Sequence, residues 1–413
     1  MRRLPPVLLL AAAGLVAATG LTACTSAGGS AAPTWVPSPA QVGGGEGGGG
    51  GGLTPIVPLP QRTDGESGGG PGPAQGTSPT PSPSRKPGDP LVVATHLTAP
   101  VGLAMLPDGT ALVGERTTGR IVRVQPVAGR PVPTVRRLTG LDTAGDGGLL
   151  DLAVSPTYAE DNLIYAYVTT AHDNRVVDFT LHGPVTPVLT GIPKGRTGNT
   201  GRLAFGADGA LYVGTGDAGH PALAQQPGSL AGKVLRVDPI GDPPRSNPHA
   251  GSPVWTSGHR VVDGLCAGPP GEGMFEVEAG TGSRSDELNS LAPGSDYGYP
   301  GASASSEPPV ATLPAPYRNP GGCTVQAGRI FVTSLDGTAL LAAPLVGPAG
   351  PRSVGPFAPV LLKTYGRLRT VVAARDGALW LTTSNRDGAG HPVATDERVI
   401  RYVNPSGGGD SPA

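Results

Sequence analysis

One phrase recurs along the chain and constrains its fold more than any other feature: two short apolar runs separated by an Asp-Gly pair. Its fullest form covers residues 202–219, with the sequence Arg-Leu-Ala-Phe-Gly-Ala-Asp-Gly-Ala-Leu-Tyr-Val-Gly-Thr-Gly-Asp-Ala-Gly. Asp-Gly between apolar runs is a strong β-hairpin signal, because glycine adopts a positive φ without steric cost. The phrase occurs with the turns Asp108-Gly109, Asp208-Gly209, Asp336-Gly337 and Asp376-Gly377. A hairpin repeated in this way predicts an all-β repeat architecture.

Other strand-like runs lie between these hairpins, at residues 121–124, 163–168, 176–179, 234–237, 329–332 and 399–403. Four-stranded antiparallel units of about 40–50 residues are typical of β-propeller blades. About 315 residues lie between Pro90 and Pro405, so this unit length predicts a six-bladed β-propeller. A pair of packed sheets is the rival architecture, but it does not explain the repeated hairpin. The last strand, residues 398–403, is expected to close the ring beside residues 91–93.

Residues 1–24 are predicted to be a targeting segment. Arg2 and Arg3 precede an apolar run over residues 7–16, which is too short for a stable membrane span. Leu21-Thr22-Ala23-Cys24 resembles a bacterial lipobox, in which the cysteine becomes the lipidated first residue of the mature protein. An ordinary secretory signal with a chance cysteine is the alternative. The first interpretation predicts an exported protein that is lipid-anchored at Cys24 to the outer face of the cell membrane.

Residues 25–89 are predicted to be a disordered linker between this anchor and the propeller of residues 90–405, and residues 406–413 a disordered tail. The linker contains a glycine run over residues 43–52 and a Pro-Ser-Thr run over residues 78–84, neither of which can bury a core. The net charge is −1 and only 15% of residues are charged, so the composition predicts no nucleic-acid partner. Nothing in the sequence indicates an oligomeric state.

Two cysteines remain in the globular part, Cys266 and Cys323. An exported compartment permits disulfides, which favours a bridge between them. Two free buried thiols are the alternative.

Several motifs together resemble the soluble PQQ-dependent sugar dehydrogenases, the glucose/sorbosone dehydrogenase family of six-bladed propellers. The motifs are found at residues 147–150 (Gly-Gly-Leu-Leu), 230–238 (Leu-Ala-Gly-Lys-Val-Leu-Arg-Val-Asp), 257–260 (Ser-Gly-His-Arg), 285–300 (from Ser-Asp-Glu-Leu-Asn to Tyr-Gly-Tyr-Pro) and 365–369 (Tyr-Gly-Arg-Leu-Arg). The resemblance covers about residues 91–403. It implies a quinoprotein oxidoreductase that oxidises an aldose with pyrroloquinoline quinone (PQQ) and calcium.

The catalytic positions that the resemblance implies are replaced. The family's general base is a histidine before Gly-Arg-Leu, and Gly198 stands at that position. Glycine cannot accept a proton, the neutral amide of Asn199 is not a base, and His220 lies downstream. If the cofactor binds, Gly198→His is expected to raise the rate. The family's glutamine before Gly-Gly-Leu-Leu is Asp146, and a lysine that pairs a PQQ carboxylate aligns with Asp336.

Other positions are retained. The resemblance implies three cofactor-binding arginines, at Arg260, Arg367 and Arg369. A guanidinium can pair with a carboxylate of the cofactor through two parallel hydrogen bonds. Salt bridges between blades are the alternative role for these three residues. Backbone carbonyls at Gly280 and Thr281 align with the calcium site. Three side chains, those of Asp286, Glu287 and Tyr297, form a second candidate metal set, with capping of a loop by the carboxylates as the alternative.

Two functions from different classes follow. The replaced base favours a non-catalytic propeller that binds a sugar, an envelope glycan or a protein in its axial cleft. The resemblance favours an active PQQ-dependent dehydrogenase. Fold alone does not decide between them.

Overall fold

The computed structural model describes residues 89–403, except for residues 281–284 and 348–352. The predicted targeting segment, nearly all of the linker and the tail lie outside these described residues. Within them, no helix is long and apolar enough to cross a membrane. The helices are a short α1 (Tyr158–Asp161) and the 3₁₀ turn η1 (Pro221–Gln225).

The strands form six antiparallel sheets, which confirms the predicted six-bladed β-propeller. Blade 1 consists of β2 (Pro100–Met105), β3 (Ala111–Glu115), β4 (Arg120–Val124) and β5 (Thr134–Arg137). Blade 2 consists of β6 (Leu149–Val154), β7 (Ile164–Thr169), β8 (Asn174–Phe179) and β9 (Val185–Ile192). Blade 3 consists of β10 (Gly201–Phe205), β11 (Leu211–Thr215), β12 (Lys233–Val237) and β13 (Val254–Ser257).

The second half of the propeller repeats this order with one addition. Blade 4 consists of β14 (Val262–Ala267), β15 (Met274–Glu278), β16 (Glu287–Leu291) and β17 (Ala311–Thr312). Blade 5 has five strands, β18 (Pro320–Gln326), β19 (Arg329–Ser334), β20 (Ala339–Val346), β21 (Ser353–Val354) and β22 (Ala358–Leu362). Blade 6 consists of β23 (Leu368–Ala373), β24 (Leu379–Thr383), β25 (Val399–Tyr402) and, from the other end of the chain, β1 (Val92–Ala94).

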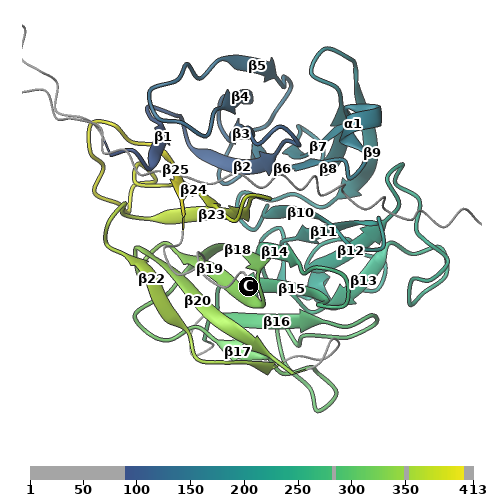
Figure 1. Ribbon diagram of the computed structural model, residues 1–413. Helices are drawn as coiled ribbons and strands as arrows, with labels where there is room; N and C mark the ends of the chain where they lie inside the picture. The colour runs from purple at the N-terminus through teal and green to yellow at the C-terminus, as the bar shows by residue number, and fades with distance from the viewer. Residues whose placement is uncertain (1–88, 281–284, 348–352, 404–413) are drawn as a thin grey trace, which may run out of the picture. The chain divides into compact units, whose positions relative to one another are not determined.

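The blades follow one another around a common centre. In Figure 1 the chain runs from blue blades at the top, through teal on the right and green below, to yellow on the left. The innermost strands β2, β6, β10, β14, β18 and β23 each contact the next, and β23 contacts β2. Apolar clusters fill the spaces between neighbouring sheets. This ring leaves its axis free for polar side chains.

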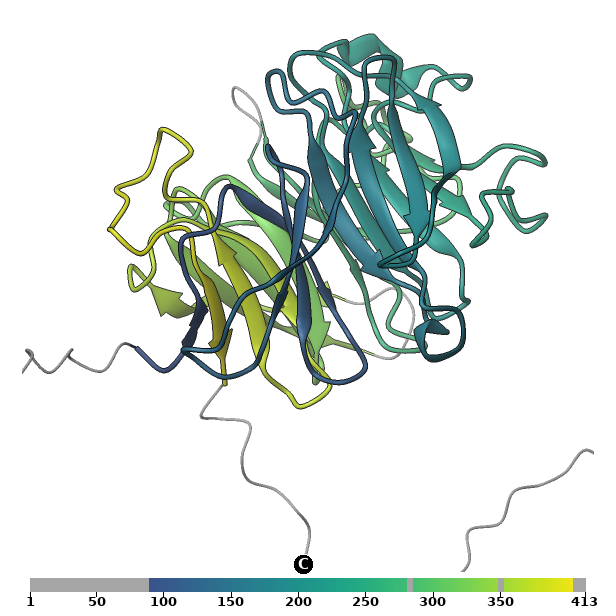
Figure 2. The same cartoon turned by 90° about the horizontal axis from the view of Figure 1, so that it is seen from above.

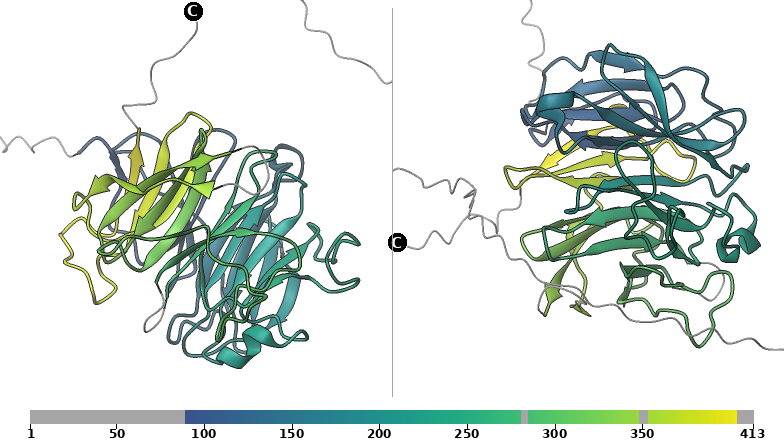
Figure 3. Two further views of the ribbon diagram at one scale, coloured as in Figure 1. Left: turned by 90° about the horizontal axis from the view of Figure 1, so that it is seen from below. Right: turned by 90° about the vertical axis from the view of Figure 1, so that its right-hand side faces the viewer.

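The ring is closed by pairing the two ends of the described chain, as the sequence predicts. Val92 pairs with Ile400, and Ala94 pairs with Val399. Figure 2 and the left panel of Figure 3 show the dark-blue first strand beside the yellow last ones. Blade 6 is therefore assembled from residues about 300 positions apart, so the propeller cannot form until both ends have folded.

Three of the four predicted hairpins share one turn chemistry. The glycines at 109, 209 and 377 have φ values of 81°, 76° and 84°. In each turn, the aspartate before the glycine accepts a hydrogen bond from the backbone N–H two residues after it. The same aspartate forms a salt bridge with an arginine on the third strand of its blade: Asp108 with Arg123, Asp208 with Arg236, and Asp376 with Arg401. The turn at Asp336-Gly337 differs, because the positive φ falls on Thr338. The second role of these aspartates was not predicted from the sequence.

The disulfide between Cys266 and Cys323 is present, which confirms the favoured prediction. It joins β14 to β18, the innermost strands of blades 4 and 5. These strands also pack directly against each other. The bridge therefore ties two neighbouring blades close to the axis.

Candidate functional site

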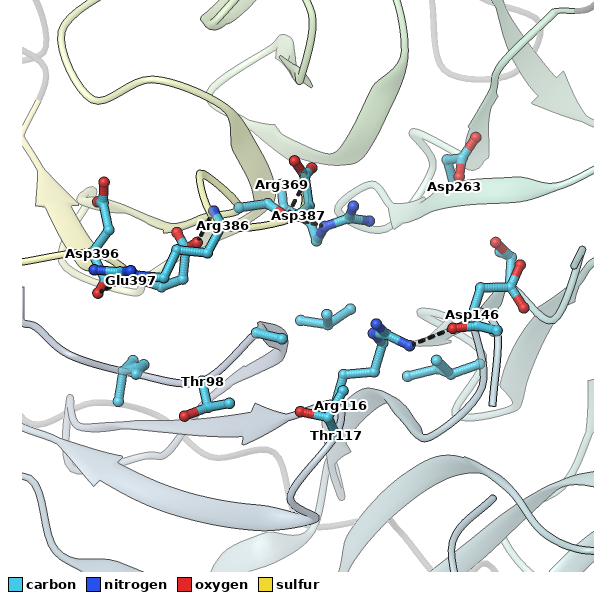
Figure 4. A pocket seen from close by; sticks show the side chains of 18 of the residues that line it. Thr98, Arg116, Thr117, Asp146, Asp263, Arg369, Arg386, Asp387, Asp396 and Glu397 are labelled. Atoms are coloured by element: carbon cyan, nitrogen blue, oxygen red, sulfur yellow. Dashed lines mark hydrogen bonds between the residues drawn. The ribbon is translucent and has the colours of Figure 1, made fainter. Parts of the chain in front are cut away.

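A polar cavity of about 660 Å³ lies where the inner strands of several blades meet. Segments next to β2, β6, β10, β14 and β23 contribute its walls, together with the loops after β3 and β24. Among the described residues that line it, none is Phe, Tyr or Trp, and His96 is the one histidine. Charged groups of both signs dominate, and all but Arg202 are labelled in Figure 4: Arg116, Asp146, Arg202, Asp263, Arg369, Arg386, Asp387, Asp396 and Glu397. The cavity therefore suits a ligand that both donates and accepts many hydrogen bonds.

Three of the four arginines use their guanidinium groups to hold the backbone. Arg116 Nη1 donates to the carbonyls of Gly145 and Gly147, at 3.2 and 2.9 Å. Arg202 donates to the carbonyls of Asp263 and Gly321, at 2.5 and 2.6 Å. Arg386 donates to the carbonyl of Asp396 at 3.0 Å. Their positive charge is not neutralised by these neutral acceptors, so it remains available to an anionic group in the cavity.

Arg369 is the arginine best placed to meet a ligand. Its Nε donates to Ser384 Oγ at 3.2 Å, and within the described part of the chain its terminal nitrogens have no hydrogen-bond partner. Burial lowers the pKa of Arg369 to about 10, with repulsion from Arg202 acting in the same direction. A guanidinium that is desolvated without a bonded carboxylate gains most when an anion or a polar ligand approaches it.

Some acidic side chains of the cavity are already held by several hydrogen bonds within the protein, and others have fewer such partners. Glu397 accepts hydrogen bonds from Thr383 Oγ1 and from the N–H groups of Asn385 and Arg386. Asp387 accepts from Arg367 Nε at 2.9 Å. These groups therefore stabilise the walls of the cavity.

Asp146 and Asp263 have fewer partners. Asp146 Oδ1 accepts from Asn199 Nδ2 at 2.6 Å, and Asp263 Oδ2 accepts from Ala279 N at 3.1 Å. Burial raises the pKa of Asp263 to about 6, although Arg202 and other nearby arginines lower it. These two carboxylates are the groups that can accept a hydrogen bond or a proton from a ligand.

Gly198, the predicted position of the missing base, has a backbone that excludes a side chain. Its φ is 70°, and a Cβ atom built there would lie 2.4 Å from Asp217 Oδ1. The neighbouring Asn199 is fully buried and bonds Asp146, Gly195 and Asn174. His220 is exposed and does not line the cavity. Thus none of the three supplies a base here.

The structure separates the three predicted cofactor-binding arginines. Arg369 lines the cavity, whereas Arg260 and Arg367 are not among its lining residues. Arg260 Nη1 donates to Ala279 O at 3.2 Å. Arg367 pairs with Asp336 at 2.8 Å and with Asp387 at 2.9 Å, which is the salt-bridge role given as the alternative. Asp336 is thus occupied by Arg367 and also lies outside the cavity lining.

The side chains of the second candidate metal set have the following partners. Asp286 accepts from the N–H groups of Gly280 and Asn319, at 2.9 and 2.6 Å, as a loop cap does. Tyr297 is buried, and its hydroxyl bonds Ser290 O and Ala292 N. Glu287 begins β16 opposite Glu278. Thr281 lies outside the described residues, so the predicted carbonyl pair stays a prediction.

Arg116, Arg202 and Arg386 were not predicted as cavity residues. Arg202 stands in the repeated hairpin and was assigned only to the framework, and no motif marks the other two. Their role depends on which strand ends converge, which a single sequence does not give.

The fold and the cavity define the class of protein: a six-bladed β-propeller with a polar cavity where its inner strands converge. Comparison with known proteins gives the family. The family model for glucose/sorbosone dehydrogenase matches residues 97–327, and the chain belongs to this family.

Among curated relatives, quinoprotein glucose dehydrogenase B of Acinetobacter calcoaceticus is 31% identical over 51% of this chain and 52% of its own length. The aldose sugar dehydrogenase YliI of Escherichia coli is 28% identical over 51% of this chain and 61% of its own length. The chain thus spans about half to three fifths of the curated relatives it matches.

Solved structures match over more of their length. The PQQ-bound aldose sugar dehydrogenase of Streptomyces coelicolor is 40% identical, with a TM-score of 0.70, over 75% of this chain and 95% of that chain. A glucose dehydrogenase-type oxidoreductase from Thermus thermophilus is 37% identical, with a TM-score of 0.69, over 75% of this chain and 98% of that chain.

Proposed function

We propose that this protein is an exported, lipid-anchored member of the family that binds a sugar or an envelope glycan in its axial cavity without oxidising it. The observation that carries this proposal is the backbone at Gly198. The base position has no side chain, its positive φ disfavours any residue but glycine, and Asp217 occupies the space that a Cβ would need. Loss of a general base lowers a rate by roughly 10²–10⁴-fold.

The cavity walls support a hydroxyl-rich ligand. A sugar hydroxyl can donate to Asp146 or Asp263 and accept from Arg369, and all three line the same cavity. Such mixed donor and acceptor groups suit a neutral polar ligand better than an apolar one. The relatives named above are glucose and aldose dehydrogenases, so aldoses are the first ligands to test.

The test is calorimetric titration of the purified full chain with D-glucose, a panel of aldoses and soluble envelope glycans. We expect saturable binding that weakens at least tenfold in Asp146→Asn and in Arg369→Met, while the exposed Asp242→Asn serves as the matched control. Mixtures with PQQ and calcium should reduce no redox dye above background. Absence of binding to every carbohydrate would contradict the proposal.

An active quinoprotein is the second candidate, and one observation favours it. The Asp146 carboxylate lines the cavity and bonds Asn199, the residue after the missing base, so it is placed to accept a proton instead. Arg369, with the charges of Arg116 and Arg202, fits the carboxylates of PQQ, and calcium would be held by the carbonyls of the predicted pair at Gly280. When bound, PQQ supplies the hydride acceptor.

The two candidates give opposite results in one assay. Aldose-dependent dye reduction with PQQ and calcium, abolished in Asp146→Asn and unchanged in Asp242→Asn, would establish the second candidate and refute the first. No PQQ-induced absorbance change in either the parent or the control would remove the second.

The membrane anchor is proposed from the lipobox-like residues 21–24. Labelling with a radioactive fatty acid should mark the parent chain, and Cys24→Ser should abolish the label and release the protein from the membrane fraction. An unlabelled parent chain would show that residues 1–24 act as an ordinary secretory signal.

A further inference from the structure

Three potential metal ligands meet in the interior between blades 3 and 4, and none of them is among the residues that line the axial cavity. They are His259, just after β13, and Glu276 and Glu278, on one face of β15. One ligand atom from each lies within 4.8 Å of the other two. Their exposed fractions are 0%, 0% and 4%. Buried carboxylates are costly unless a cation or hydrogen bonds compensate them.

The protein's own partners do not compensate this cluster. Glu276 Oε1 accepts from Asn289 Nδ2 at 2.6 Å, and Glu278 Oε2 accepts from Arg260 N at 2.8 Å. Within the described residues, Glu276 Oε2 and His259 Nδ1 are buried without a hydrogen-bond partner. The nearby Lys233 ammonium donates instead to three backbone carbonyls. Two carboxylates and an imidazole nitrogen are therefore left facing one another.

The histidine is held in an orientation that suits a ligand. Its Nε2 bonds Thr256 Oγ1 at 2.8 Å, which aims Nδ1 at Glu276 Oε1, 3.4 Å away. The Tyr297 ring stacks on the imidazole, with centroids 4.9 Å apart. Burial lowers the pKa of His259 to about 4, so the ring is neutral and its Nδ1 lone pair is free to coordinate. A fixed second nitrogen is the usual arrangement around a metal-bound histidine.

We propose that His259, Glu276 and Glu278 bind one divalent transition-metal ion of the zinc or manganese type, which ties blade 3 to blade 4. One nitrogen and two carboxylates form a donor set that such ions accept, whereas calcium takes oxygen ligands. Burial raises the pKa of Glu276 and of Glu278 to about 8, so a bound divalent ion displaces their protons, and the two carboxylates then balance its charge. With metal–ligand distances of about 2.0–2.2 Å, ligand atoms around a tetrahedral ion lie about 3.4 Å apart, which is the separation of His259 Nδ1 and Glu276 Oε1. Ligand atoms that are up to 4.8 Å apart must approach one another by up to about 1.4 Å, so the site closes when a metal binds.

This site differs from the calcium positions that the family resemblance implies. The resemblance places calcium at the carbonyls of Gly280 and Thr281, and the second candidate metal set is Asp286, Glu287 and Tyr297. None of these five residues is a ligand of the site proposed here. Asp286 is instead committed to the N–H groups of Gly280 and Asn319. The exposed Asp242 provides the control, because Asp242→Asn removes a carboxylate without removing a proposed ligand.

The test uses the full chain purified without chelator. We expect about one equivalent of zinc or manganese by mass spectrometry, a melting temperature several degrees lower after dialysis against EDTA, and recovery on adding zinc or manganese alone. Glu276→Gln keeps the oxygen that accepts from Asn289, and it should bind zinc at least 100-fold more weakly. Asp242→Asn should bind it as the parent does.

Cobalt(II) gives a second readout that does not depend on stability. Addition to the metal-free parent should produce visible absorption of nitrogen and oxygen ligation, and this band should be missing in Glu276→Gln. Metal content below about 0.1 equivalent together with no zinc-dependent or manganese-dependent change in melting temperature would overturn the proposal. Recovery by calcium but not by zinc or manganese would overturn it as well.

Discussion

Replacing Gly198 tests directly whether the backbone excludes a base from the axial site. Gly198 and Gly209 have nearly the same positive φ, 70° and 76°. A Cβ at 198 would lie 2.4 Å from Asp217 Oδ1, whereas a Cβ at 209 meets nothing within 4 Å. Gly209→Ala therefore measures the conformational penalty alone, and Gly198→Ala adds the steric conflict.

The expected losses follow from these contacts. A left-handed conformation costs a non-glycine residue about 1–2 kcal/mol, which is the loss expected for Gly209→Ala. At 198, Asp217 must also move, although it accepts from Gly219 N and from the Tyr299 hydroxyl, each at 2.8 Å. Disturbing a buried hydrogen-bonded carboxylate costs a further ~1–3 kcal/mol. Gly198→Ala should thus lose about 2–5 kcal/mol of unfolding free energy.

Guanidinium unfolding followed by tryptophan fluorescence measures both variants. Losses that agree within about 0.5 kcal/mol would refute the steric argument. If the argument holds, Gly198→His destabilises the loop and does not simply restore a base. The expectation from sequence that this substitution raises the rate then fails for a structural reason.

Three further predictions concern the framework. Arg236→Met should lower the free energy of unfolding by about 1–3 kcal/mol, because Arg236 bonds Asp208 and the buried Asn247. Arg123 is more exposed, so Arg123→Met should lower it by less than about 1 kcal/mol. Equal midpoints of urea unfolding for the two variants would contradict this. Cys266→Ser removes a disulfide between residues 57 positions apart, and it should lower the free energy of unfolding by about 4 kcal/mol. Dithiothreitol should lower the melting temperature of the parent but not that of the variant. Burial raises the pKa of Asp151 to about 6, so between about pH 4 and pH 6 this carboxyl holds a proton more often in the folded state than in the unfolded state. The free energy of unfolding should therefore fall by up to about 3 kcal/mol as the pH rises from ~4 through ~6. Asp263 titrates in the same pH window, so Asp151→Asn should reduce this slope by about half in pH-dependent melts and Asp242→Asn should leave it unchanged. A slope that Asp151→Asn does not reduce would count against the assignment.

The sequence by itself determined the architecture, because blade formation depends on local patterns. Asp-Gly turns and alternating apolar runs specify hairpins, and the length of the globular part divided by the length of one blade gives six blades. The closure of β25 on β1 also followed, since a ring of blades needs its two ends to meet. Motif resemblance then identified the family and the replaced base at Gly198.

Tertiary structure decided the site, because the cavity and the buried clusters combine residues from distant segments. Arg367 and Arg369 are two positions apart, yet Arg367 is held by Asp336 and Asp387 while Arg369 faces the cavity. The choice between a disulfide and two thiols depended on β14 packing against β18. His259 lies 17 and 19 positions from its two glutamates, with no spacing that marks a metal site. The packing of the blades determines which charged side chains meet in the interior, and a local sequence pattern does not reveal that packing.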